Sequence, residues 1–271
     1  MARVVELSYC PVKGCAGTSV REALLTPAGL AHDRSFMVVS EEGVYRTQRR
    51  DPLLAVIRPL VSPDGDRLTL TAPEAEPLHL RVDTSGTRQK VDLFGTAYQG
   101  IDQGDEAADW LSDLLGVPSR LVRTPPEHDR VTDGLTPGTS GYALHVLSRS
   151  TLDLLNTRMT ARGAQPLAVD RFRPNLVVDG WDDPHTEDRA HRLRIGTTEL
   201  GYAKLAIRCA VTLVDQNAGT RAGPEPLRTL AGYRRAIQGG VAFGTKYAVL
   251  RPGKVAVGDE VEVTRWGESE L

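Results

Sequence analysis

The first third of the chain reads as short strand-like segments, and apolar and polar residues alternate in those at 67–71 and 78–82. This two-residue period is typical of strands that bury one face, and glycine, proline and charged residues separate the segments. Short strands at such close spacing favour a barrel or a sandwich. The strands predicted here cover residues 4–10, 35–39, 44–47, 67–71 and 78–82, and the second and third are expected to form a hairpin around Glu42-Gly43.

A few segments instead repeat apolar residues at the 3.6-residue spacing of a helix. Glycine follows two of them, where a left-handed backbone commonly ends a helix. The predicted helices are 105–115, ended by Gly116; 151–162, with Ser150 as N-cap and Gly163 after the last turn; and, less regular, 226–235.

A stretch rich in proline, glycine and charge, residues 124–138, separates this part from a second β-rich part. Such composition is typical of linkers and long loops. Strands are expected again at 175–178, 199–214 and 254–264. The pattern therefore predicts a β-rich α+β protein with a few helices and a boundary between its two parts within residues 124–138.

Composition narrows the class of protein. The 271 residues are 40% hydrophobic and 25% charged with a formal net charge of -2, so no overall basic field favours nucleic acid or an anionic membrane. No apolar run is long enough to span a membrane. The three cysteines, Cys10, Cys15 and Cys209, are too few for a disulfide framework or for a cluster with four cysteine ligands. We expect a soluble cytoplasmic protein.

Cys209 is the first candidate for chemistry. Odd-numbered positions from 203 to 213 are all apolar, so the alternation predicts that the Cys209 side chain faces a core. On that pattern alone a small buried hydrophobe is the favoured reading. The neighbouring Arg208 favours a functional role instead, because a guanidinium stabilises a thiolate. A soft thiolate is a suitable ligand for a thiophilic metal.

Two further groups of residues suit an anionic ligand. In the segment Asp170-Arg171-Phe172-Arg173-Pro174-Asn175 the two arginines, if extended, point to one side and offer planar forks to a phosphate, and the Asn175 amide suits a heterocycle. A solvated strand end with a salt bridge explains the same residues equally well. The turn at Lys13-Gly14 could place backbone N–H groups and a cation beside an anion, although a plain turn is favoured in isolation.

The ordered series of these segments resembles the MOSC superfamily, in the two-domain form with an N-terminal MOSC β-barrel and similar to the mitochondrial amidoxime reducing component and its bacterial relatives. No single motif is specific, but their order along the chain is. The matching segments are Pro11-Val12-Lys13 with Cys15, Gly29-Leu30 with Asp33-Arg34, Thr47-Gln48-Arg49, Leu147-Ser148 with Thr151-Leu152, 172–178, Arg208-Cys209 with Asp215 and Gly219, 225–234, Phe243-Gly244, and 252–261.

The resemblance implies a fold in which the N-terminal β-barrel subdomain, 1–120, packs on a MOSC β-barrel domain, 121–271. It implies a molybdenum cofactor (Mo-molybdopterin) with Cys209 as catalytic residue and metal ligand. The implied cofactor-binding residues are Lys13, Gly14, Arg34, Ser140, Ser148, Arg171, Arg173, Asn175, Arg208 and Tyr247.

The resemblance further implies an oxidoreductase that reduces small N-hydroxylated substrates such as amidoximes and hydroxylamines. Electrons would come from a separate donor protein of the ferredoxin, flavoprotein or cytochrome type. Two alternatives stay open: a sulfur carrier that uses a persulfide on Cys209, and a cofactor-binding protein without turnover. A cation set contributed by both halves of the chain favours the enzyme, because a sulfur carrier has no evident use for it.

Overall fold

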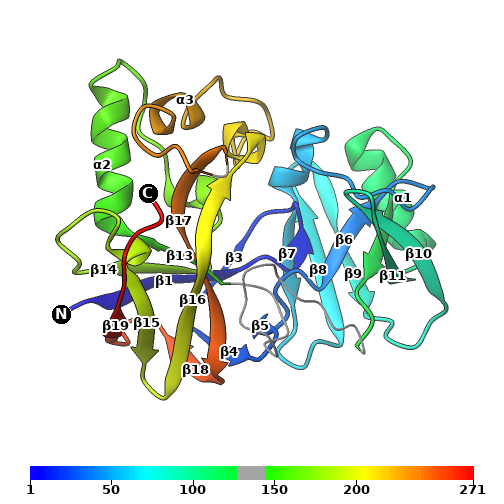
Figure 1. The fold of residues 1–271 in the computed structure, drawn as a ribbon. Coiled ribbons are helices and arrows are strands. Elements are labelled where there is room, and N and C mark those ends of the chain that lie inside the picture. The colour runs from blue at the N-terminus through cyan, green and yellow to red at the C-terminus, as the bar shows by residue number, and fades with distance from the viewer. Residues whose placement is uncertain (127–143, 238) are drawn as a thin grey trace.

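The computed structural model describes residues 1–126, 144–237 and 239–271, and it forms two lobes joined side by side (Figure 1). Strands dominate both lobes, so the predicted β-rich α+β class is confirmed. Most of the predicted linker lies outside the described residues. No helix within the described ranges is both long and apolar enough to cross a membrane.

The larger lobe is built on one mixed sheet, to which the N-terminal strand contributes. Its hydrophobic core is formed by both halves of the chain, since Val4 and Leu7 pack with Val146, Leu176 and Leu193. In the described chain the order of its eight strands is β19 (Val261–Trp266), β15 (Ala190–Ile195), β16 (Thr198–Arg208), β17 (Val241–Arg251), β13 (Leu144–Ser148), β14 (Leu176–Asp179), β1 (Arg3–Tyr9) and β3 (Thr18–Val20).

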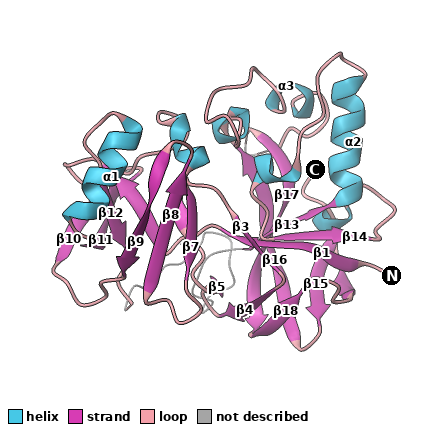
Figure 2. Cartoon of the chain, turned by 180° about the vertical axis from the view of Figure 1, so that it is seen from behind, coloured by secondary structure: helices cyan, strands magenta, loops and turns pink. Residues whose placement is uncertain are grey.

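Three smaller sheets complete the described structure. Two of them form the smaller lobe and pack with helix α1, whereas the third lies against the larger lobe (Figure 2). The smaller lobe contains β10 (Arg88–Leu93), β11 (Thr96–Asp102), β12 (Arg120–Arg123), β6 (Phe36–Val39) and β2 (Val12–Lys13) in one sheet and β7 (Arg58–Val61), β8 (Arg67–Ala72) and β9 (Ala75–Arg81) in another; the third sheet is β18 (Gly253–Ala256), β4 (Glu22–Thr26) and β5 (Gly29–Leu30).

The N-terminal segment crosses between the lobes several times. Strand β1 pairs with β14 of the larger lobe, β2 pairs with β6 of the smaller lobe, and β3 returns to β1. After β4 and β5 the chain crosses again into β6. Residues 10–17 and 31–35 therefore lie at the junction of the lobes, and with them Lys13 and Arg34.

The observed helices match the predicted ranges to different degrees. The prediction for α1 (Asp105–Leu115) is confirmed, and Gly116 ends it with φ of 68°. Helix α2 (Arg149–Thr160) begins two residues earlier than predicted, and α3 is a single turn, Leu227–Leu230. The remaining helical turns are the 3₁₀ segments η1 (Pro52–Val56), η2 (Val169–Phe172), η3 (Thr186–Asp188) and η4 (Ala210–Leu213).

Two strand predictions are wrong in part. The expected partner of β6 over residues 44–47 is reduced to isolated bridges, because Val44 pairs with Asp92 and Tyr45 with Val39. The predicted strand 199–214 ends at Arg208 and continues as η4. The strands at 67–71 and 78–82 are confirmed as β8 and β9.

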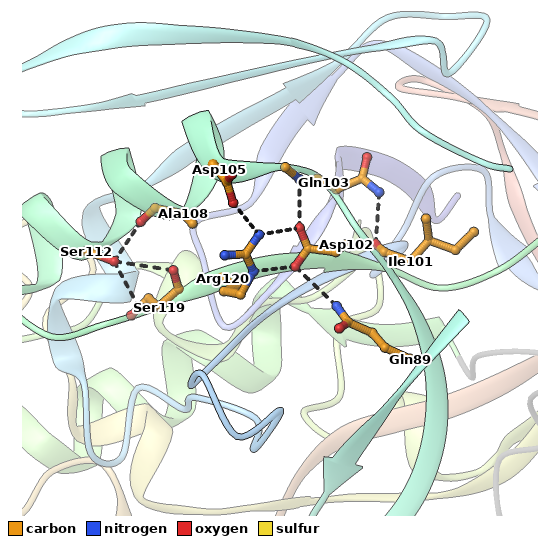
Figure 3. A network of polar contacts seen from close by, with 10 residues as sticks. Gln89, Ile101, Asp102, Gln103, Asp105, Ala108, Ser112, Ser119 and Arg120 are labelled. Atoms are coloured by element: carbon orange, nitrogen blue, oxygen red, sulfur yellow. Dashed lines mark hydrogen bonds and ion pairs between the residues drawn. The ribbon is translucent and has the colours of Figure 1, made fainter. Parts of the chain in front are cut away.

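A polar network ties α1 to its sheet (Figure 3). The Arg120 guanidinium donates to both oxygens of Asp102, at 2.6 and 2.8 Å, and to Asp105 at the start of α1, at 2.9 Å. Gln89 and the backbone N–H of Gly104 donate to the same Asp102 carboxylate. The two-pronged contact fixes the corner where β11 turns into the helix.

We expect Arg120→Ala to lower the free energy of unfolding by about 1 kcal/mol, because a partly exposed bidentate pair is stronger than an ordinary surface pair. Urea unfolding measures this difference. Arg81→Ala, on the exposed face of β9, is the control and should change stability by less than about 0.5 kcal/mol. Equal effects of the two substitutions would contradict the assigned role of Arg120.

Candidate functional site

Four cationic side chains gather where the lobes meet, and we call Arg34, Arg173, Arg208 and Lys246 the cation cluster. Arg34 comes from the crossing segment after β5, Arg173 follows η2, Arg208 ends β16 and Lys246 lies in β17. Arg34 and Arg173 lie close enough to Arg208 for their charges to lower its pKa, and Arg34 and Arg208 do the same to Lys246. Segments far apart in sequence therefore bring positive charges close together. A bound anion would offset the repulsion between them.

A buried carboxylate holds one side of the cluster in place. Asp33 forms an ion pair with Arg34 and accepts the backbone N–H of Cys10 at 2.6 Å. The side-chain amide of Asn175 donates to Asp33 at 3.4 Å and to the Ser8 carbonyl at 3.2 Å, and its oxygen accepts the His145 N–H at 3.0 Å. Asn175 thus links β1, β13 and the turn that carries Arg34.

Arg171 and Arg173 do not form the extended pair that the sequence suggested, and that interpretation is wrong. Residues 169–172 form η2, and Arg173 adopts a left-handed backbone with φ of 54° before Pro174. The helical turn sends the two side chains apart. Arg171 forms an ion pair with Asp215 at 3.0 Å, whereas Arg173 donates to the Cys15 carbonyl in the crossing segment.

Cys209 lies at the edge of this cluster, and its side chain is exposed. The prediction that it faces a core is wrong, because β16 contains a bulge between Leu205 and Ile207. An extra residue shifts the alternation by one, so Leu205 and Ala206 are both buried while Ile207 is 47% exposed. The strand then ends, and Cys209 becomes the first residue before η4, which leaves its thiol accessible.

Arg208 connects Cys209 to the rest of the cluster. Its guanidinium donates to the Phe172 carbonyl at 2.8 Å and stands 5.9 Å from the centre of the Phe172 ring. Burial lowers its pKa to about 10; Cys209 opposes this effect, and the charges of Arg173 and Arg34 add to it. Its buried Nε has no hydrogen-bond partner among the described residues, so it can donate to a ligand.

Lys13 and Gly14 line the side of the junction that faces the smaller lobe. The Lys13 ammonium lies 5.5 Å from the centre of the Tyr45 ring. Gly14 has φ of 89°, and a Cβ there would stand 3.1 Å from the Tyr45 hydroxyl, so only glycine fits without strain. Arg173 and Arg34 act electrostatically on the same tyrosine, which places Lys13 next to the cluster.

Two implied binding residues, Ser148 and Tyr247, are not brought to the cluster. Ser148 is the N-cap of α2, where its oxygen accepts the Thr151 N–H at 3.2 Å; Ser150 was the predicted cap, and that prediction is wrong. Tyr247 lies in the large core and donates to the carbonyls of Glu187 and Ala190. Ser140 lies outside the described residues.

The structure adds Lys246 and His145, neither of which is among the binding residues that the resemblance implies. In β17 the side chains alternate, so Tyr247 points into the core while Lys246 points to the cluster. The available signal was one charged residue, the lysine, within the mostly apolar run 241–250. His145 is fully buried, and burial together with Lys246 and Arg208 keeps its pKa well below the usual range, so this imidazole is neutral.

The residues present fit an anionic group that also carries a thiophilic metal. The cluster offers several cations to an anion, and Nε of Arg208 is buried and without a hydrogen-bond partner in the described ranges. Cys209 supplies one accessible soft ligand. Across the described residues, no three His, Cys, Asp or Glu side chains meet to hold a metal ion. A metal here would therefore be held by Cys209 together with the bound group.

Comparisons with known proteins identify the family. The MOSC N-terminal beta barrel domain matches residues 1–118, and the MOSC domain matches residues 133–262. Human mitochondrial amidoxime-reducing component 1 is 33% identical over 284 residues, which cover 95% of this chain and 82% of that protein. The zebrafish (Danio rerio) molybdenum cofactor sulfurase is 34% identical over 90% of this chain but only 32% of its own length.

The rat mitochondrial amidoxime reducing component 2 is similar in the same way, with 33% identity over 93% of this chain and 80% of that protein. The chain belongs to the MOSC-domain superfamily, in the two-domain form that carries an N-terminal MOSC β-barrel. The division at residue 120 stays a prediction.

Proposed function

We propose that this protein is a molybdenum-cofactor-dependent oxidoreductase that reduces small N-hydroxylated compounds, such as amidoximes, with electrons from a separate donor protein. The observation that carries the proposal is the exposed thiol of Cys209 at the edge of a cluster of four cations. The names of the human and rat relatives, which are amidoxime-reducing components, support the choice of substrate class.

Each part of the site has a role in this proposal. Cys209 would hold the metal, and Arg34, Arg173 and Arg208 would bind the anionic end of the cofactor. Lys13 and Gly14 are proposed to close the side facing the smaller lobe, and Asn175 keeps Arg34 in position through Asp33. When bound, the cofactor supplies a molybdenum centre that exchanges two electrons and an oxygen atom with the substrate.

Burial governs how the chain's own residues act. Water is excluded from the Arg208 Nε, so its hydrogen bond to an anion is stronger than it would be at an exposed site. Arg171 is held by Asp215 and supports the loop on which Arg173 lies. The exposure of Cys209 would let a small substrate approach a metal held there.

Metal and pterin analysis tests the proposal. Protein produced in a host that makes the cofactor should contain about one molybdenum per chain, as expected for a single thiolate ligand, and Cys209→Ala should lose it. Molybdenum that stays bound in Cys209→Ala, or wild-type protein without molybdenum and pterin, would overturn the proposal.

A sulfur carrier is the second candidate, because Cys209 is accessible and one relative is named a molybdenum cofactor sulfurase. In that case the same protein would lack molybdenum and carry a cyanide-labile sulfur on Cys209. A cofactor-binding protein without turnover would contain the metal but fail to reduce benzamidoxime with an artificial donor. The cytoplasmic location also stays a proposal, which cell fractionation can test.

A further inference from the structure

Lys246 occupies an unusual position within the sheet. It is the sixth residue of β17, and the residues on either side of it, from Val241 to Val249, are buried. The strand register sets it opposite His145 of β13 and opposite Lys204 of β16. Directly opposite residues project from the same face, so two lysines and a histidine form a row across three strands.

No ion pair within the described chain involves Lys246, Lys204 or His145, so the row has no paired carboxylate to offset its positive charge. The Lys246 amine forms no hydrogen bond and no ion pair with any described residue. The charged and titratable groups that face it are Arg34, Arg208, Lys204, His145, Asp33 and Cys10. Asp33 is the single carboxylate among them, and Arg34 already pairs with it.

We propose that Lys246 binds the anionic end of the ligand held by the cation cluster, and that it takes up a proton from solvent as the anion binds. The inference rests on the proposed function in that the natural ligand is the cofactor. A dianion placed between Lys246, Arg34 and Arg208 would remove the repulsion among them and would give the amine an acceptor.

The electrostatics of the free site explain the proton. Burial, followed by the charges of Arg34 and Arg208, lowers the pKa of Lys246 well below its usual range, and Asp33 and Cys10 oppose this only in part. The amine therefore loses its proton in the free protein at a lower pH than a solvated lysine. Bound negative charge favours the ammonium form, so binding raises the pKa and takes up a proton.

The sign of the pH dependence follows. Below the lowered pKa of Lys246 the amine is already protonated, and affinity for a dianion does not depend on its titration. Above it, each bound anion must bring one proton, so affinity falls by about tenfold per pH unit. His145 does not mimic this behaviour, because its pKa lies well below the usual range and it stays neutral in the same window.

Sulfate is a suitable probe for the protein without cofactor, because it keeps both charges between about pH 6 and about pH 9. Calorimetric titrations in buffers of different ionisation enthalpy count the protons taken up. Wild-type protein should bind sulfate with uptake of close to one proton at the upper end of this range. Lys246→Met should bind at least about tenfold more weakly and take up none.

Lys246→Arg separates charge from titration, because arginine stays protonated throughout. It should bind sulfate without proton uptake and with no fall in affinity as the pH rises. Lys254→Met, at an exposed lysine of β18, is the matched control and should behave as the wild type does. Circular dichroism and the unfolding temperature verify that each variant is folded.

Sulfate that does not bind, binds without proton uptake, or binds equally well to Lys246→Met would overturn the inference. These outcomes are separable from the failure of the proposed function. If molybdenum binds through Cys209 but sulfate binding does not depend on Lys246, the proposed function holds and the inference about Lys246 fails. If sulfate binding is coupled to proton uptake but the protein never acquires molybdenum, the inference about Lys246 holds and the proposed function fails.

Discussion

Replacing Cys209 by serine is expected to lower the rate of benzamidoxime reduction by more than about 100-fold while the protein keeps its fold. Loss of a residue that only supports a metal ligand costs about 10- to 100-fold, so loss of the proposed ligand itself should cost more. A serine oxygen is a hard ligand and a poor replacement for a thiolate on a thiophilic metal. The side chain is exposed, so the substitution leaves no cavity.

The neighbouring position provides a matched control. Ala210 is also exposed, and Ala210→Ser adds a hydroxyl next to the site without touching the thiol. We expect this variant to keep its molybdenum and to retain activity within about threefold, as surface substitutions usually do. Full activity in Cys209→Ser, measured with an artificial electron donor and normalised to molybdenum content, would refute the role assigned to the thiol.

The second large effect concerns stability and lies away from the proposed site. Asp188 and Arg234 form an ion pair at 2.5 Å, and their side chains are only 1% and 6% exposed. Asp188 also accepts the Thr245 hydroxyl at 3.1 Å, and Arg234 donates to the Ala242 carbonyl. This pair joins η3 to β17 and to the segment after α3, so it holds the end of the large sheet together.

We expect Asp188→Ala to lower the free energy of unfolding by about 3–5 kcal/mol, because it leaves the Arg234 guanidinium buried without its charge partner. Removing both charges at once, in Asp188→Leu with Arg234→Met, should restore most of the loss, since a buried ion pair adds little beyond well-packed apolar groups. Urea unfolding followed by circular dichroism compares the variants.

The exposed pair of Glu22 and Lys254 is the control for this experiment. Glu22→Ala removes the same kind of charge from a pair that water screens, so stability should change by less than about 1 kcal/mol. A loss of similar size in Glu22→Ala and Asp188→Ala would show that burial does not govern the energetics of the Asp188–Arg234 pair.

Local signals were sufficient wherever the structure depends on neighbouring residues. Helix α1 has the predicted limits because its apolar spacing and the left-handed Gly116 lie within one short segment. Strands β8 and β9 follow the alternation of their own residues. The sequence also supplied the residue types of the site, a thiol and several arginines, since these do not depend on the fold.

Contacts between distant segments decided the rest. Ser148 caps α2 instead of Ser150, because pairing of β13 with β14 at Val178 and the bond from the Ser148 N–H to Glu187 fix where the strand ends and the helix begins. The turn η2 separates Arg171 from Arg173, and their partners, Asp215 and the Cys15 carbonyl, are remote in sequence. No pattern within residues 170–175 indicates either partner.

The sequence by itself determined the family and the β-rich class, and it singled out Cys209 as the candidate thiol. The tertiary structure alone decided which way side chains point at the site. In a strand the period is two, so a shift of one residue reverses the face. A bulge in β16 exposes Cys209, and the register of β17 assigns Lys246 instead of Tyr247 to the cluster, because hydrogen bonds to neighbouring strands fix both.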